Sequence, residues 1–150
     1  MEKQKQIFII GFMASGKSTF GKKLAKQNGY SFLDTDKLIE QEEGMKIPEI
    51  FEKYGERYFR NLEKLALKRL INNDNNQVVA TGGGMSCNQH NLNLMKSNGK
   101  IIYLQIDIKS IINRLKNAKV KRPILANLSD KELERKIKNL LSKRLKYYHY

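Results

Sequence analysis

Short apolar runs alternate with helical patterns along almost the whole chain. Four runs, at residues 6–10, 31–34, 77–81 and 100–106, have the length and composition of strands. Between them, apolar residues recur at steps of three and four, which is the spacing of one helix face. Strands that alternate with helices predict βαβ units and a mainly parallel sheet with helices on both faces.

Start and stop signals divide the helical patterns. Glycines follow three of them, and Asp107 and Ser129 are suited to cap helices that begin directly after them. The first helix ends near residue 28, and the others cover residues 36–43, 47–54, 56–72, 88–97, 108–115 and 130–146. Two of these helices have apolar stripes that we expect to face the core. The stripes consist of Phe20, Leu24 and Ala25, and of Phe59, Leu62, Leu65, Ala66 and Leu70.

Length and composition fit one globular domain over residues 1–150. The chain has 150 residues, of which 40% are hydrophobic and 29% are charged, as is usual for a domain with a single core. With the pattern of elements, this predicts an α/β protein with a three-layer α/β/α sandwich around a central parallel sheet of four visible strands.

The net charge of +14 allows two interpretations. A basic surface can bind nucleic acid or an anionic membrane, or it can be a solvated surface that attracts small anionic ligands. We favour the second, because the lysines are spread along the whole chain rather than gathered in one block. We therefore expect no nucleic-acid partner and no membrane partner.

Three features indicate a cytoplasmic protein. No apolar run approaches the roughly 20 residues needed to cross a bilayer. The polar start of the chain leads directly into the first strand and does not resemble a secretory signal. The single cysteine, Cys87, excludes an internal disulfide and suits a reducing compartment.

Residues 11–18, Gly-Phe-Met-Ala-Ser-Gly-Lys-Ser, match a phosphate-binding loop. They follow a predicted strand and open a predicted helix, which is the context that this loop requires. The glycines allow a tight turn whose N–H groups point at phosphate oxygens. Lys17 would reach the β- and γ-phosphates of ATP, and Ser18 would give its hydroxyl to Mg²⁺. The segment therefore predicts a P-loop NTPase fold.

Asp34 and Asp36 stand at the end of the second predicted strand. In an extended segment, carboxylates two positions apart face the same side. They repel each other unless a cation or hydrogen-bond donors share the site, which suits Mg²⁺ and a hydroxylated substrate. Alternatively, Thr35 or Asp36 caps the next helix, although a cap would leave Asp34 unexplained.

Two arginines are candidates for binding anions. Arg60 and Glu63 are neighbours on a predicted helix, so the glutamate can hold the guanidinium toward a substrate carboxylate. The same spacing is common in ordinary surface ion pairs. Arg122 lies in a basic loop from which it could neutralise charge during phosphoryl transfer, or the loop could simply be solvated.

Three glycines, Gly82, Gly83 and Gly84, follow the third predicted strand. They are costly in backbone entropy, so either the backbone approaches a ligand or another chain segment there, or the segment is a flexible turn. The first three strands thus each end in a polar or glycine-rich segment. Because parallel sheets bind ligands at the carboxyl ends of their strands, we expect one site at this edge.

Together these segments resemble the shikimate kinase family over residues 7–148. The resemblance rests on the P-loop, Leu33-Asp34-Thr35-Asp36, Gly55-Glu56 with Phe59-Arg60 and Glu63, the triple glycine, and Arg122-Pro123-Ile124-Leu125. It implies an ATP-dependent phosphotransferase that moves the γ-phosphoryl group to the 3-hydroxyl of shikimate, on the route to chorismate and the aromatic amino acids. We expect ATP and shikimate as substrates, Mg²⁺ as cofactor, and a monomer.

The resemblance also implies a role for each site residue. Lys17, Asp36 and Arg122 would be catalytic, and Ser18 and Asp34 would hold the metal. ATP would be bound by Gly11, Met13, Ala14, Ser15, Gly16, Lys17, Ser18, Thr19, Arg114 and Arg122. Shikimate would be bound by Asp36, Phe51, Phe59, Arg60, Gly82, Gly83, Gly84 and Arg144. The segment at about 36–63 would form a helical substrate-binding region, and the segment at about 116–127 would form a lid.

The chain departs from the family pattern in three places. Ala14 stands where a glycine is frequent, and Lys146 where a proline is common. The family usually continues beyond residue 150 into a fifth strand and a final helix, so we expect a fifth strand in a complete chain.

Four other interpretations compete. A gluconate kinase shares the architecture, but the setting of Arg60 and the triple glycine favour shikimate. A guanine-nucleotide switch would need an Asn-Lys-x-Asp segment, which the sequence lacks. Asp107 could be the metal aspartate, but a helix pattern begins right after it, so we favour a cap. A nucleic-acid-binding module would explain the charge but not the carboxylates at the strand ends.

Overall fold

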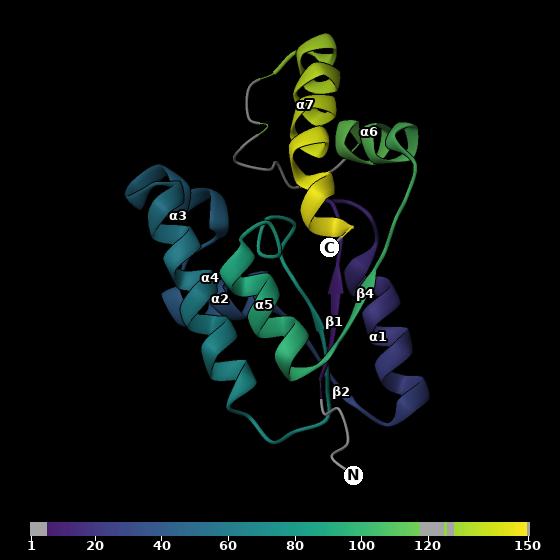
Figure 1. Ribbon diagram of the computed structural model, residues 1–150. Helices are drawn as coiled ribbons and strands as arrows, with labels where there is room; N and C mark the ends of the chain where they lie inside the picture. The colour runs from purple at the N-terminus through teal and green to yellow at the C-terminus, as the bar shows by residue number, and fades with distance from the viewer. Residues whose placement is uncertain (1–5, 118–124, 126–127, 150) are drawn as a thin grey trace.

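The computed structural model describes residues 6–117, 125 and 128–149, and it confirms the α/β fold (Figure 1). The strands are β1 (Gln6–Ile10), β2 (Ser31–Asp34), β3 (Gln77–Ala80) and β4 (Lys100–Tyr103). The helices are α1 (Lys17–Asn28), α2 (Thr35–Glu43), α3 (Ile47–Tyr54), α4 (Glu56–Ile71), α5 (Gln89–Asn98), α6 (Ile108–Lys116) and α7 (Asp130–Tyr148). None of the described helices is long and apolar enough to span a membrane.

The four described strands form one parallel sheet in the order β2-β3-β1-β4. Strand β1 lies inside the sheet, because Ile9 is paired with Ala80 of β3 on one side and with Ile102 of β4 on the other. Side chains of β1 and β3 are buried on both faces of the sheet. That burial explains why these two strands are continuous apolar runs rather than alternating patterns.

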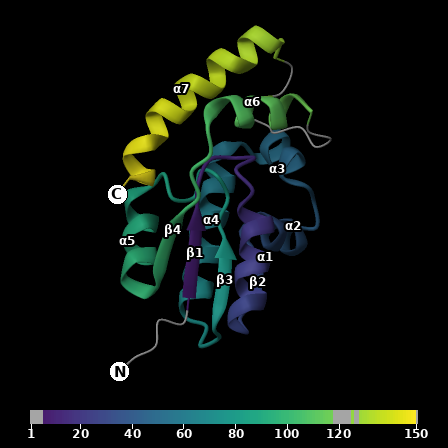
Figure 2. The same cartoon turned by 90° about the vertical axis from the view of Figure 1, so that its right-hand side faces the viewer.

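Helices cover both faces of the sheet (Figures 1 and 2). Helix α1 packs on one face, where Ala25 meets Ile9 and Val78. Helices α4 and α5 cover the other face, where Leu67 and Leu92 join the main core. Helices α6 and α7 lie beyond the carboxyl ends of the strands (Figure 1). The segments that follow β1 and β3 contact α7, where Arg144 lies over Phe12 and Tyr148 bonds to Gly83.

Most predicted boundaries agree with the structure to within one or two residues, and Asp107 and Ser129 are confirmed as helix caps. Strands β3 and β4 are shorter than predicted. The chain leaves the sheet after the N–H groups of Thr81 and Leu104 have bonded to the carbonyls of β1. Helix α7 extends to Tyr148, two residues beyond the predicted end.

The apolar stripes were predicted only in part, because Phe20 is 38% exposed and Leu65 is 52% exposed. In α4 the buried residues are Phe59, Glu63, Ala66, Leu67 and Leu70. These positions lie on one face of the helix, and the charged Glu63 is one of them. A stripe drawn through apolar residues alone is therefore rotated away from the true core face.

We expect Leu67→Ala to lower the free energy of unfolding by about 3 kcal/mol, because it opens a cavity at a side chain that is fully buried. Leu65→Ala, two residues away on the same helix, is the matched control and should change it by less than about 0.5 kcal/mol. Urea unfolding measures both. A larger loss for Leu65→Ala would show that the sequence-derived stripe is the correct core face.

Candidate active site

A cavity of about 590 Å³ opens beside the carboxyl ends of β2 and β3. It brings together segments that are far apart in the sequence. All predicted shikimate-binding residues line it: Asp36, Phe51, Phe59, Arg60, Gly82, Gly83, Gly84 and Arg144. The predicted metal-binding residues, Ser18 and Asp34, line it as well. The walls are α2, α3 and the first half of α4, which correspond to the segment predicted at about 36–63.

An adjoining cavity of about 220 Å³ lies over the phosphate-binding loop. Its lining includes most of the predicted ATP-binding residues: Met13, Ala14, Ser15, Gly16, Lys17, Ser18 and Thr19. Asp34, Asp36, Gly82 and Gly83 border both cavities. A group bound in one cavity would therefore meet a group bound in the other.

The loop at residues 11–18 is closed by its own lysine. The buried Lys17 donates from Nζ to the carbonyl oxygens of Gly11 at 2.7 Å and Phe12 at 2.9 Å. Arg114 donates to the carbonyl oxygen of Ala14 at 2.9 Å, which places this predicted ATP ligand beside the loop. Ala14 has a φ of 61°, in the region that favours glycine, so its departure from the family pattern introduces local strain.

Asp34 and Asp36 meet the site differently from the prediction. Asp34 is itself the cap of α2, with Oδ1 accepting from the N–H groups of Asp36 at 3.0 Å and Lys37 at 3.3 Å. The alternative that Thr35 or Asp36 caps this helix is therefore wrong. The extended geometry was also wrong, because Asp36 lies in the first turn of α2. Both carboxylates nevertheless line the same cavity.

The second oxygen of Asp34 accepts a hydrogen bond from Ser18 Oγ at 2.6 Å. Hydroxyl and carboxylate oxygens are the donors that Mg²⁺ prefers, and in nucleotide sites it uses one or two carboxylates together with phosphates. The residues present therefore fit a divalent metal held partly by nucleotide phosphates.

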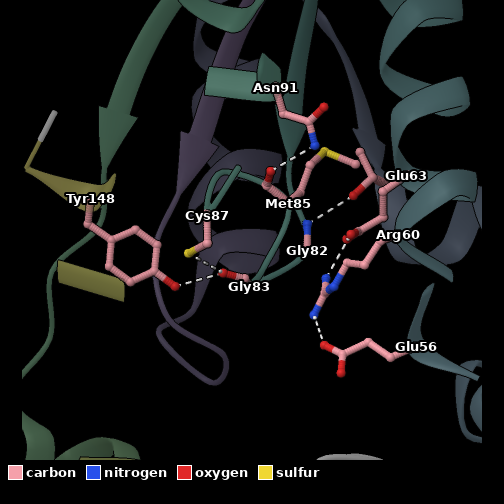
Figure 3. A network of polar contacts seen from close by, with 10 residues as sticks. Glu56, Arg60, Glu63, Gly82, Gly83, Met85, Cys87, Asn91 and Tyr148 are labelled. Carbon is pink, nitrogen blue, oxygen red and sulfur yellow. Dashed lines mark hydrogen bonds and ion pairs between the residues drawn. The ribbon is translucent and has the colours of Figure 1, made fainter. Parts of the chain in front are cut away.

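Arg60 is held from two sides (Figure 3). Its Nη1 donates to Glu63 at 2.7 Å, and its Nη2 lies 3.3 Å from Glu56. The Glu63 side chain is only 1% exposed, so this is not an ordinary surface ion pair. Two carboxylates thus orient one guanidinium at the cavity wall.

The carboxyl of Glu63 has a raised pKa. Its burial raises the pKa to about 7, although Arg60 draws the value back down. For Arg60, burial alone would lower the pKa, but the two glutamates outweigh it and raise the pKa above its usual value. Glu63 is more deeply buried than Arg60. The loss of hydration therefore raises its pKa by more than the attraction of Arg60 lowers it.

The glycine segment, residues 82–84, packs against Asp36 and Arg60. A Cβ on Gly82 would lie 2.6 Å from Asp36 Oδ1, and one on Gly84 would lie 2.6 Å from Arg60 Nη1. Arg60 cannot move aside easily, because Glu63 and Glu56 hold it. The prediction of a close backbone approach is therefore correct, although the groups approached here are side chains that line the cavity.

Arg144 comes to the cavity from α7 and is only 6% exposed. Its guanidinium lies over the ring of Phe12, 5.5 Å from the centroid. Among the described residues, its buried Nη1 has no hydrogen-bond partner. A buried guanidinium with an unused donor is suited to a bound anion.

Two parts of the site were not anticipated or are not described. Thr35 accepts a hydrogen bond from the N–H of Gly82 at 2.9 Å, and Tyr148 donates to Gly83 at 2.7 Å. Thr35 lies inside the segment Leu33-Asp34-Thr35-Asp36, but the sequence indicated it only as a possible helix cap, and Tyr148 belongs to none of the motifs. Arg122 and most of the predicted lid at 116–127 lie outside the described residues.

Comparisons with known proteins agree on one family. The family model described as "SKI: Shikimate kinase" matches residues 13–150. A shikimate kinase from Sulfurihydrogenibium sp. (strain YO3AOP1) is 46% identical over 144 residues, covering 96% of this chain and 82% of that protein. A solved shikimate kinase from Acinetobacter baumannii, in complex with shikimate, has a TM-score of 0.89 at 36% identity, covering 97% of this chain and 78% of the other.

A more distant structure shows the fold alone. A gluconokinase from Sinorhizobium meliloti 1021 has a TM-score of 0.54 at 14% identity, covering 95% of this chain and 76% of the other. The architecture is therefore shared with kinases that have other names. The identity of residues in the cavity, rather than the fold, must distinguish the substrates.

We expect the stability of the protein to fall as pH rises from about 4.5 to about 7, by up to about 3 kcal/mol from Glu63 alone. In this range the folded state binds the Glu63 proton more tightly than the unfolded state, so removing it favours unfolding. Urea unfolding between pH 5 and pH 8 measures the change.

Glu63→Gln should remove this contribution, so the variant should gain stability relative to the wild type as pH rises. Glu56→Gln is the matched control, because it removes the other, exposed partner of Arg60. A wild type and a Glu63→Gln variant with parallel pH profiles would contradict the expectation.

Proposed function

The chain belongs to the shikimate kinase family, and on that premise we propose how its own residues carry out the reaction. The protein is an ATP-dependent kinase that transfers the γ-phosphoryl group to the 3-hydroxyl of shikimate, giving shikimate 3-phosphate and ADP. The motifs in the sequence predict the same function.

One observation carries the assignment of the acceptor site: the half-buried Arg60, the buried Arg144 and two aspartates line the same cavity. Shikimate is a small carboxylate with several hydroxyls. We propose that Arg60 and Arg144 bind its carboxylate, since one is oriented by glutamates and the other has an unused donor. Asp36 would then accept hydrogen bonds from its hydroxyls.

The hydrophobic wall of the cavity suits the carbon ring of shikimate. Phe51 and Phe59 lie with their ring centroids 5.0 Å apart, and both line the cavity. Gly82, Gly83 and Gly84 would contact the substrate through their backbone, opposite these rings. Contact with apolar groups on one side and polar groups on the other would fix the orientation of the ring.

On the nucleotide side, Lys17 would turn from the loop carbonyls to the β- and γ-phosphates. A fixed cation there stabilises the negative charge that develops during phosphoryl transfer. Asp36 borders both cavities and would hold the attacking hydroxyl toward the γ-phosphate through its carboxylate oxygens. Arg114, beside the loop, would contact the nucleotide, and Arg122 would complete the phosphate site from the lid at about 116–127.

Family membership implies use of ATP with a divalent metal, and we propose that the metal is Mg²⁺. Ser18 would be one ligand, and Asp34 would hold the ion directly or through water. When bound, the ion neutralises phosphate charge. The roles of the chain are to present the two oxygens and, through the capping bonds of Asp34, to keep that carboxylate in place.

Other parts of the assignment follow from the same site. A positive field attracts ATP and shikimate, which are both anions, so the net charge needs no nucleic-acid partner. We propose a cytoplasmic monomer in which residues 1–150 act as one kinase domain.

We expect the wild type to release ADP with shikimate and not with gluconate in a coupled assay. Arg60→Lys should raise the KM for shikimate at least about tenfold, because a lysine cannot reproduce the planar fork, and should leave the KM for ATP nearly unchanged. Arg57→Lys is the matched control, since Arg57 is exposed on the same helix. Turnover with gluconate, or a loss of ATP affinity in Arg60→Lys, would contradict the assignment.

We expect chelation of divalent metal to stop turnover and added Mg²⁺ to restore it. Asp34→Asn should raise the Mg²⁺ concentration needed for half-maximal rate by roughly tenfold, because it removes a charge beside the ion. Asp107→Asn is the control, since Asp107 caps α6 away from both cavities. If Asp107→Asn raised the Mg²⁺ concentration needed for half-maximal rate and Asp34→Asn did not, Asp107 rather than Asp34 would be the metal ligand.

A further inference from the structure

The C-terminal end of α7 carries two buried side chains close to the site. Arg144 and Tyr148 are four residues apart, which places them on one face of the helix. Both are almost fully buried, at 6% and 1% exposure. Arg144 reaches the cavity itself, whereas Tyr148 stops behind it, at the glycine segment. Tyr148 does not line the cavity, so any role in binding must act through another group.

Tyr148 donates its phenolic O–H to the carbonyl oxygen of Gly83 at 2.7 Å (Figure 3). The thiol of Cys87 approaches the same oxygen at 3.9 Å, which is a weak contact by comparison. Burial raises the pKa of the Tyr148 phenol well above its usual value, so the group stays protonated and remains a donor.

The position of this phenol is set by the sheet. The ring of Tyr148 stacks on Tyr103 of β4, with centroids 5.2 Å apart and planes 15° from parallel. Tyr103 is paired with Ile10, the residue that precedes the phosphate-binding loop. The hydroxyl of Tyr148 is therefore held relative to the same strand that positions this loop.

Gly83 borders both cavities. A Cβ on Gly83 would lie 3.1 Å from the backbone nitrogen of Met13 and 3.5 Å from Arg144 Nη1. Its neighbours Gly82 and Gly84 pack against Asp36 and Arg60. A small shift of the Gly83 carbonyl would therefore move the backbone of residues 82–84. Asp36, Arg60 and Arg144, the polar groups proposed to bind the acceptor, all pack against this backbone.

We propose that Tyr148 is a positioning residue for the acceptor substrate. Its hydrogen bond to Gly83 fixes the glycine segment, and its place on α7 fixes the register of Arg144 relative to that segment. The inference rests on the proposed placement of the shikimate carboxylate between Arg60 and Arg144. It adds that this placement depends on a phenol that touches neither substrate.

The test is Tyr148→Phe, which retains the stacked ring and removes only the donor. We expect the KM for shikimate to rise roughly tenfold, which corresponds to about 1.4 kcal/mol. The KM for ATP should stay within about twofold, because the hydrogen bonds of Lys17 within the loop are untouched. Tyr147→Phe, which removes a phenol from the adjacent residue, is the matched control and should behave as the wild type.

A binding readout separates positioning from general stability. In thermal unfolding of Tyr148→Phe, the shift produced by shikimate should shrink while the shift produced by ADP is kept. Equal losses of both shifts, or an unchanged KM for shikimate, would overturn the inference. If Tyr148→Phe were silent while Arg60→Lys raised the KM for shikimate, this inference would fail and the proposed site would stand. If Arg60→Lys were silent, the proposed site itself would fail.

Discussion

The acceptor side of this protein depends on the ion pair between Arg60 and Glu63, in which the glutamate side chain is almost fully buried. Removing two charges from water is costly, and their attraction offsets that cost only when geometry and further hydrogen bonds are favourable. Here Glu56 supplies a second carboxylate from the rim, and the pKa of Glu63 rises because the offset is incomplete. The hydrogen bonds to Glu63 and Glu56 keep the Arg60 guanidinium oriented before any substrate binds. Less side-chain ordering is therefore needed when an anion binds.

The remaining architecture can be understood as the enclosure of that pair. Gly82 and Gly84 have no side chains, so Asp36 and Arg60 can pack against backbone. The four described strands all end at one edge of the parallel sheet, and α7 brings the buried Arg144 to that edge. Arg60, Arg144 and Asp36 thus line one cavity, which suits a small ligand that carries both a carboxylate and hydroxyls.

The sequence predicted the fold well because its signals are local. Alternating runs, caps and the phosphate-binding loop depend on residues a few positions apart, and the structure confirms them. It did not predict that Asp34 caps α2, because a capping bond depends on where the strand turns into the helix. It misplaced Leu65, because the buried charge of Glu63 interrupts the apolar stripe. Tyr148 gave no signal at all, since its partner lies 65 residues away.

The two halves of the site also differ in how far apart their parts lie along the chain. The phosphate-binding loop is a continuous segment between β1 and α1, and its lysine bonds to carbonyls five and six residues away. The acceptor half joins α2, α4, the glycine segment and α7, so it has a much higher contact order. Contacts of long sequence separation carry a larger loop-closure cost. During folding, the nucleotide half can therefore form before the half that recognises the acceptor.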